Sequence, residues 1–149
     1  MVNQITKEDI ERFETFKDQS PNMLNLYQEI ATKSAIYPGQ GSALGLAYTA
    51  LKLNGEAGEF AEHVGKAMRD DGLIEAQLIN RNGSGGTRMG LLKPERRLSI
   101  IKEIGDVLWY LSAACNELDI KLSDAALTNL QKLHDRTNRN ALQGSGDNR

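Results

Sequence analysis

Apolar residues recur at three- and four-residue intervals along most of the chain, the spacing that places them on one face of an α-helix. The pattern is longest over residues 43–70 and 94–118, and only three prolines occur among the 149 residues. No segment shows the apolar–polar alternation expected of a half-buried strand. The sequence therefore predicts an all-α fold with four main helices and an additional N-terminal one.

Capping patterns predict where these helices begin. Thr6 precedes an acidic first turn, which indicates a helix over residues 6–19. Pro21 suits the first position of a second helix, over residues 21–35, because the N–H that proline lacks would have no helical partner there. Pro94 has the same role in the helix over residues 94–118, and Ser123 starts the last helix. The Gly-rich segment 80–90 is predicted to be a loop, and residues 144–149 a polar tail.

Composition and charge restrict the function. The net charge of −2 gives no sign of a general nucleic-acid binder. Cys115 is the only cysteine, which rules out an intramolecular disulfide and fits a reducing compartment. The polar N-terminus has no signal-peptide core, and no apolar run approaches the roughly 18 residues that a membrane helix needs. We expect a cytoplasmic protein that binds neither nucleic acid nor membrane.

Two pairs of acids have a spacing that suggests chemistry. Glu56 and Glu59 share one helix face, and so do Glu103 and Asp106 on the later helix. Solvated helices often place a lysine four residues after a glutamate. The residues in those positions here are Phe60, His63, Val107 and Tyr110.

Glycines interrupt the same two helices, although each costs about 1 kcal/mol relative to alanine in a helix interior. They lie toward the polar side, where a purely solvated surface has no use for them. This predicts that something approaches closely: another helix, a second subunit or a ligand. The glycines in question are Gly55, Gly58, Gly65 and Gly105.

Four neighbouring carboxylates repel one another unless a cation lies between them. Oxygen ligands select hard ions such as Mg²⁺ or Mn²⁺, and protein-bound Mg²⁺ characteristically also binds substrate phosphates. A di-iron bundle would need Glu-x-x-His on two helices, but Phe60 and Gln131 stand three residues before the two histidines. On the residues alone, a metal–phosphate site and an ordinary charged surface both remain open.

Two segments resemble the signature helices of the MazG-like all-α nucleoside triphosphate pyrophosphohydrolases: "GEAGEFAEHVGKAMRD" and "IIKEIGDVLWYL". The family hallmark is E-x-x-E followed by E-x-x-D, matched here by Glu56/Glu59 and Glu103/Asp106. Weaker likeness in "YQEIATKSAIYP" and "NLQKLHDR" extends the resemblance over roughly residues 24–149. The single Lys66 and the long link between the signature helices differ from the family pattern and bear on substrate preference.

The resemblance implies a four-helix-bundle-type fold over residues 21–143, with residues 1–20 as a helical extension. It also implies hydrolysis of a nucleoside triphosphate to a monophosphate and pyrophosphate by a homodimer or homotetramer. Mg²⁺, or Mn²⁺ in its place, would be held by Glu56, Glu59, Glu103 and Asp106, with Glu59 orienting or deprotonating the attacking water. Contacts to the substrate phosphates would come from Lys66, Arg69, Asn129, Lys132 and Arg136.

Other interpretations stay open at this stage. The same chemistry could serve a narrower substrate, namely dUTP, dCTP or phosphoribosyl-ATP. The acids could instead form the partner-facing surface of a non-catalytic helical interaction module. Trp109 and Tyr110 could stack on a base, although aromatic residues beside Leu108 and Leu111 more often pack in a core or an interface.

Overall fold

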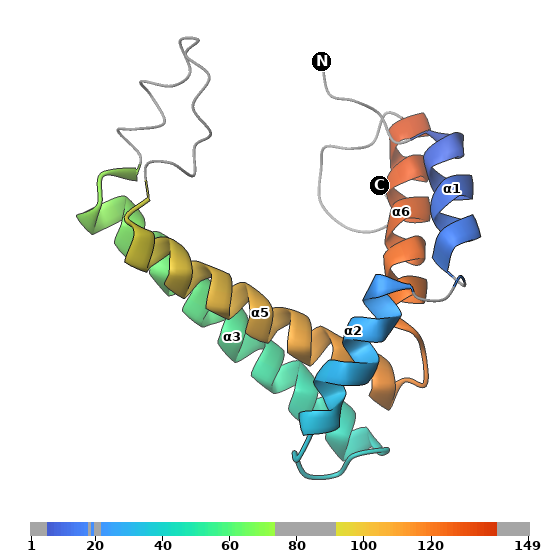
Figure 1. Cartoon of the computed structure of the whole chain (residues 1–149), viewed down its shortest axis with the longest axis horizontal. Coiled ribbons are helices and arrows are strands. Elements are labelled where there is room, and N and C mark those ends of the chain that lie inside the picture. Colours follow the sequence, from blue (N-terminus) through green and yellow to red (C-terminus); the bar gives the residue numbers. More distant parts are fainter. Residues whose placement is uncertain (1–5, 18, 20–21, 74–91, 140–149) are drawn as a thin grey trace.

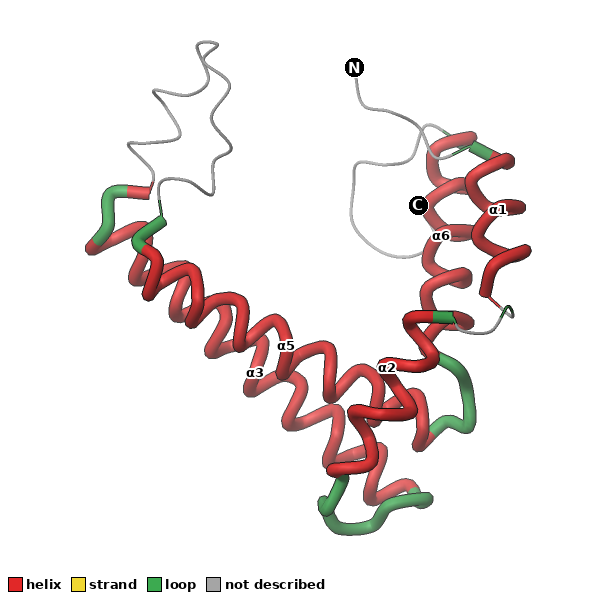
Figure 2. Tube along the Cα trace, in the orientation of Figure 1, coloured by secondary structure: helices red, strands yellow, loops and turns green. Residues whose placement is uncertain are grey.

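The computed structural model describes residues 6–17, 19, 22–73 and 92–139. This part of the chain contains five α-helices, one short 3₁₀ helix and no strand, which confirms the all-α prediction (Figures 1 and 2). None of its helices has the length and apolar character needed to span a bilayer. The elements are α1 (Lys7–Lys17), α2 (Met23–Ala31), η1 (Thr32–Ser34), α3 (Ala43–Asp70), α5 (Pro94–Glu117) and α6 (Leu122–Asn138).

The long helices follow the sequence closely, and the shorter ones differ at their starts. α3 has the predicted bounds, and the Ser42 hydroxyl caps it by accepting from the Leu44 N–H. α5 starts at Pro94 as expected. α2 starts two residues later than predicted, because the Asn22 side chain, rather than a proline, caps its first turn. α6 starts at Leu122, one residue early. Segment 80–90 and residues 144–149 lie outside the described residues.

α3 and α5 form an antiparallel pair that packs along most of its length (Figure 1). α2 crosses the end of this pair where α3 begins and α5 ends. α6 turns away from α5 and packs with α1 in a second arm, so the described chain is V-shaped (Figures 1 and 2). The protomer is therefore open rather than a closed bundle.

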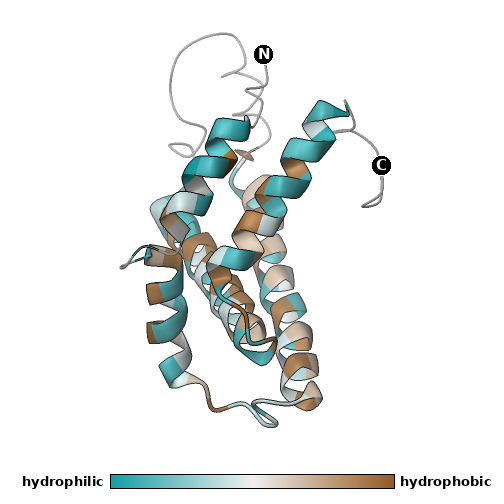
Figure 3. Ribbon diagram, turned by 90° about the vertical axis from the view of Figure 1, so that its right-hand side faces the viewer, coloured by the Kyte–Doolittle hydropathy of each residue, from teal (hydrophilic) through white to brown (hydrophobic). Residues whose placement is uncertain are grey.

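The core of the described chain is small. Its buried apolar residues are Ile10, Ala67, Ile100, Ala113, Cys115, Leu122 and Leu127. Large apolar side chains that remain exposed outnumber them, and Leu51 is exposed by 76%. Hydrophobic residues are brown along the helices of Figure 3. A soluble chain of this length normally buries a much larger apolar core. The protomer thus leaves apolar helix surface without a covering element in the described residues.

A buried amide fixes the junction of α2, α5 and α6. Gln28 donates through Nε2 to Asn116 Oδ1 at 2.7 Å and to the Ile120 carbonyl at 3.0 Å. Its Oε1 accepts the Leu122 N–H at 2.7 Å. Because every polar atom of this side chain has a partner, its burial carries no unpaired polar group. The turn between α5 and α6 is held in place by these bonds.

A carboxylate ties each end of the α3–α5 pair together. At one end, Glu117 accepts the Gly41 N–H at 2.8 Å and the Tyr37 hydroxyl at 2.6 Å, and so joins α5 to the loop before α3. At the other end, Asp71 lies 2.8 Å from Lys93 Nζ and 3.0 Å from Arg96 Nε. Hydrogen bonds from these two cations lower the pKa of Asp71. Both ends of the helix pair are thereby closed by charge-assisted contacts.

The Glu117 contact leaves no room for a side chain at position 45. A Cβ added to Gly45 would lie 2.5 Å from the Gly39 carbonyl oxygen and 2.6 Å from Glu117 Oε2. We expect Gly45→Ala to lower the free energy of unfolding by about 1–3 kcal/mol, the usual cost of overpacking, as measured by urea denaturation. Gly65→Ala is the control, since its methyl group meets nothing within 4 Å in the described chain. Equal effects of the two substitutions would contradict this reading of the loop.

Candidate metal centre

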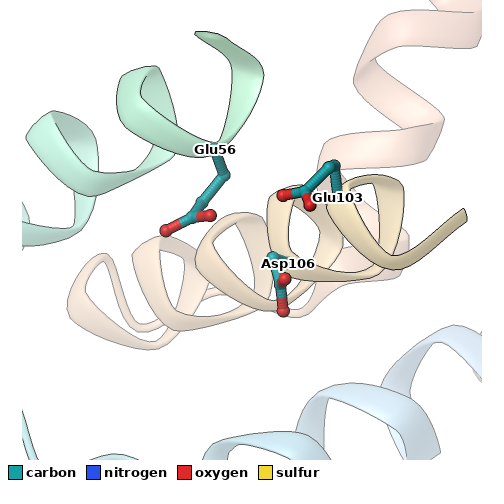
Figure 4. A group of neighbouring side chains, drawn as sticks. All are labelled: Glu56, Glu103 and Asp106. Atoms are coloured by element: carbon teal, nitrogen blue, oxygen red, sulfur yellow. The ribbon is translucent and has the colours of Figure 1, made fainter. Parts of the chain in front are cut away.

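The antiparallel packing of α3 and α5 brings three acids together. Glu56 on α3 faces Glu103 and Asp106 on α5, as Figure 4 shows. One carboxylate oxygen from each lies within 4.8 Å of the others. The side chains of Glu56 and Glu103 are only 14% and 13% exposed, whereas Asp106 is exposed. The cluster is therefore half-buried between the helices and open on one side.

This arrangement suits a hard divalent cation. Three carboxylates at such short range repel one another, and partial burial strengthens the repulsion. Around an octahedral Mg²⁺ ion, ligand oxygens are about 3 Å apart when adjacent and about 4.2 Å apart when opposite, so the carboxylate oxygens would have to move closer together to bind one ion. An all-oxygen ligand set fits Mg²⁺ or Mn²⁺ better than zinc. The open side would leave room for water or substrate oxygens in the remaining coordination positions.

Two basic side chains flank the cluster. Lys52 Nζ lies 3.5 Å from Glu56 Oε1, and His63 Nε2 lies 3.6 Å from Glu103 Oε1. Lys52 precedes Glu56 by one helical turn, whereas His63 reaches from α3 to α5. His63 Nδ1 is buried and has no hydrogen-bond partner among the residues that the structure describes. The two least exposed acids of the cluster are thus each next to a basic group.

Aromatic rings continue the site toward the start of α3. Tyr37 stacks on Tyr48 with ring centres 5.7 Å apart, and Trp109 meets Tyr110 edge-on at 4.8 Å. The Trp109 Nε1–H donates to the Ala31 carbonyl at 2.9 Å, and this hydrogen bond fixes the indole against α2. Burial raises the pKa of Tyr110, which favours its neutral phenol. These contacts support a packing role for Trp109, and base stacking on Tyr110 stays a prediction.

The other predicted site residues are not members of the three-acid cluster. Glu59 is exposed on α3 and is not a member of the group within 4.8 Å. Lys66 pairs with Glu62, and Arg69 with its neighbour Asp70. The remaining three lie on α6, in the other arm of the protomer (Figure 1), with Asn129 and Lys132 exposed and Arg136 buried. Their roles at a site stay predictions.

Sequence reasoning missed the contact between His63 and Glu103. The two residues are 40 positions apart, and their proximity depends on the register between two helices, for which the sequence has no local pattern. The position of Lys52, four residues before Glu56, was visible in the sequence, but its proximity to Tyr110 on α5 was not. Nζ of Lys52 lies 5.9 Å from the centre of the Tyr110 ring.

The four helix glycines singled out from the sequence face open space within the described chain. A Cβ added at any of them would meet nothing within 4 Å: Gly55, Gly58, Gly65 and Gly105. Close approach by another described helix of the same chain is therefore not their reason. A second subunit or a ligand remains as the predicted cause.

Comparison with known proteins identifies the family of this site. Residues 46–140 match the MazG nucleotide pyrophosphohydrolase domain, a span that contains the acidic cluster and every predicted phosphate contact. The chain is also similar to the Gene 37 protein of Mycobacterium phage L5, with 40% identity over 129 residues. That alignment covers 85% of this chain and 98% of the phage protein. No solved structure is significantly similar to the chain.

Cation binding at the cluster predicts a change in stability. An ion present at ten times its dissociation constant stabilises the folded state by about 1.4 kcal/mol, so we expect Mg²⁺ to raise the thermal midpoint by a few degrees. Asp106→Asn should abolish most of this shift, because it removes one ligand charge. Glu29→Gln, on α2 beside Lys33, is the control and should keep the full shift. The shift is measured by calorimetry with and without Mg²⁺, and its persistence in Asp106→Asn would argue against this centre.

Proposed function

The chain belongs to the MazG nucleotide pyrophosphohydrolase family, and on that premise we propose that it hydrolyses nucleoside triphosphates, with ribose or deoxyribose, to monophosphates and pyrophosphate in the presence of Mg²⁺. One observation carries the proposal. Glu56, Glu103 and Asp106 meet in space although they come from two helices, and their donor set suits the ion that accompanies triphosphates. Mn²⁺ is the expected substitute because it has similar ligand preferences.

The proposed reaction cleaves the bond between the α-phosphorus and the oxygen that bridges the α and β phosphates. Water attacks the α-phosphorus, pyrophosphate leaves with the bridging oxygen, and the water gives up a proton. A divalent cation held by the cluster would neutralise negative charge that builds up on the phosphate oxygens. The three acids would hold that cation on the wall formed by α3 and α5, against which the triphosphate has to lie.

Glu59 is proposed to orient or deprotonate the attacking water. It follows Glu56 by three residues, so it lies on the same side of α3 and next to the cluster. The structure has no ion pair between Glu59 and another described residue. Because its carboxylate is exposed and lies outside the three-acid group, it is available to accept a proton, which a fully engaged metal ligand does less readily.

The predicted phosphate-binding residues divide into two groups. Lys66 and Arg69 follow Glu59 along α3 and are proposed to bind phosphate by exchanging their present acidic neighbours for the substrate. Asn129, Lys132 and Arg136 belong to α6 in the other arm. We propose that this second group contacts the substrate bound at the acidic cluster of another copy of the chain.

Association of two copies explains the exposed apolar surface. α5 carries exposed Leu98, Ile101, Ile104 and Leu111, a set with helical spacing. Covering such a stripe with the equivalent stripe of a second copy would supply the core that one protomer lacks. The glycines facing open space on α3 and α5 would allow close approach. A homodimer is the simplest arrangement, and pairing of two dimers would give a homotetramer.

Activity is tested by measuring pyrophosphate release from a panel of ribo- and deoxyribonucleoside triphosphates, with and without Mg²⁺. dUTP, dCTP and phosphoribosyl-ATP belong in the panel because a preference for one of them would narrow the substrate class. We expect Glu59→Gln to lower kcat by about 10²- to 10⁴-fold, the usual contribution of a positioned acid–base group. Asp106→Asn should also lower Mg²⁺-dependent activity, because it removes one ligand charge from the cluster. Glu11→Gln, at an exposed acid on α1, is the control and should retain activity.

Absence of Mg²⁺-dependent pyrophosphate release from every nucleotide would overturn the proposed activity. In that case the cluster would instead be examined as a partner-facing surface of a non-catalytic module. Loss of activity in Glu11→Gln equal to that in Asp106→Asn would contradict the assignment of the site, because Glu11 lies outside the cluster.

The oligomer is tested by light scattering. We expect Ile104→Glu to give a monomer, because it places a charge in the apolar stripe of α5, whereas Ile36→Glu, at an isoleucine in the loop before α3, should leave the assembly intact.

If α6 serves the site of another copy, co-expressed Asp106→Asn and Lys132→Ala chains should regain up to about a quarter of wild-type activity in a dimer. Recovery no greater than that of the separate variants would place both residues in the same protomer's site.

A further inference from the structure

Lys52 occupies a position between two parts of the proposed site. Its ammonium lies 3.5 Å from Glu56, a proposed metal ligand, and 5.9 Å from the centre of the Tyr110 ring on α5. Tyr110 follows Asp106 by one helical turn, so both neighbours of this lysine adjoin the acidic cluster. The lysine side chain is 46% exposed, which leaves it free to reach outward from α3.

Helix stability gives little reason for this pair. A Lys–Glu pair at i, i+4 is weaker when the lysine comes first, as it does here. Partly exposed ion pairs of this kind contribute little to folding. Glu56 is nevertheless only 14% exposed, so the adjacent positive charge of Lys52 offsets part of the cost of burying a carboxylate between two helices. The main effect of Lys52 is therefore to compensate the charge of Glu56 rather than to stabilise the helix.

Binding of Lys52 and of a divalent cation to the same Glu56 carboxylate would place two positive charges side by side. A cation bound to Glu56 would lie close to the ammonium, and the two positive charges would repel. A triphosphate removes this conflict, because it brings several negative charges to the open side of the cluster. Lysine has a flexible four-carbon stem and a compact charge, which suits it to move from one anion to another.

We propose that Lys52 is a positioning residue that neutralises Glu56 in the substrate-free protein and transfers its charge to the triphosphate when the cation occupies the cluster. The cation and the nucleotide then bind more tightly together than separately, beyond their direct attraction. The inference rests on the proposed function, which supplies the triphosphate. In the absence of a nucleotide, Lys52 therefore weakens the binding of a cation to the cluster.

The first test uses Mn²⁺ alone, followed by electron paramagnetic resonance of the substrate-free protein. We expect Lys52→Met to bind Mn²⁺ about two- to fivefold more tightly than wild type, the factor that corresponds to a partly exposed ion pair. Lys52→Arg should behave as wild type, because it keeps the charge. Lys102→Met is the matched control: Lys102 precedes Asp106 by four residues, as Lys52 precedes Glu56, but forms no ion pair with a described residue.

The second test uses a nucleoside triphosphate whose α–β bridging oxygen is replaced by NH, which resists hydrolysis at the proposed bond. Lys52→Met should bind it about tenfold more weakly in the presence of Mn²⁺, since a charge-assisted phosphate contact is lost. The factor by which the analogue tightens Mn²⁺ binding should fall in the variant, and reciprocally. In turnover, KM should rise while kcat changes much less, and Lys52→Arg should restore KM.

Unchanged Mn²⁺ affinity in Lys52→Met, or no Mn²⁺ binding by either form, would overturn the proposal. So would tighter Mn²⁺ binding with unchanged affinity for the analogue, because Lys52 would then only shield Glu56. Failure of the proposed function has a different signature, since wild type would release no pyrophosphate from any nucleotide. Both titrations measure binding rather than hydrolysis, so their results can be interpreted even if the protein hydrolyses no nucleotide.

Discussion

The antiparallel packing of α3 against α5 is the interaction on which the rest of this structure depends. It brings one acid from α3 next to two from α5, a meeting that neither helix can produce alone. The contacts of Glu117 and Asp71 close the two ends of the pair and so limit sliding of one helix along the other. Because a shift of one helical turn moves a side chain by about 5.4 Å, limiting that sliding keeps the three carboxylates close to one another.

The same helix pair also explains why the protomer is unusually open. α3 and α5 use one side of each helix against the other, while α1 and α6 form a separate arm (Figure 1). The apolar stripe of α5 and the glycines of both helices face space that no described element fills. In the association that we propose, a second copy would cover this surface and its α6 would reach the acidic cluster. Assembly and substrate binding would then depend on the same part of the molecule.

Much of the fold was predictable, and the limits of prediction are informative. The bounds of α3 and α5 follow from periodicity and capping, which are local properties of the chain. The predicted start of α2 was two residues early, because Pro21 suits the first position of a helix whereas the structure uses Asn22 as the N-cap. The two acid pairs were recognised from their spacing, and the family match over residues 46–140 confirmed the resemblance. The spacing did not reveal that Glu59 lies outside the group that includes Glu56.

By itself, the sequence determined the all-α class, the two long helices and the acids that they carry, because helical periodicity and side-chain chemistry are local properties of the chain. Only the tertiary structure decided which acids meet, which basic groups stand beside them, and that α6 lies in the other arm. Those facts depend on the relative register and direction of helices joined by loops. Many registers satisfy the same apolar pattern, and packing selects one of them.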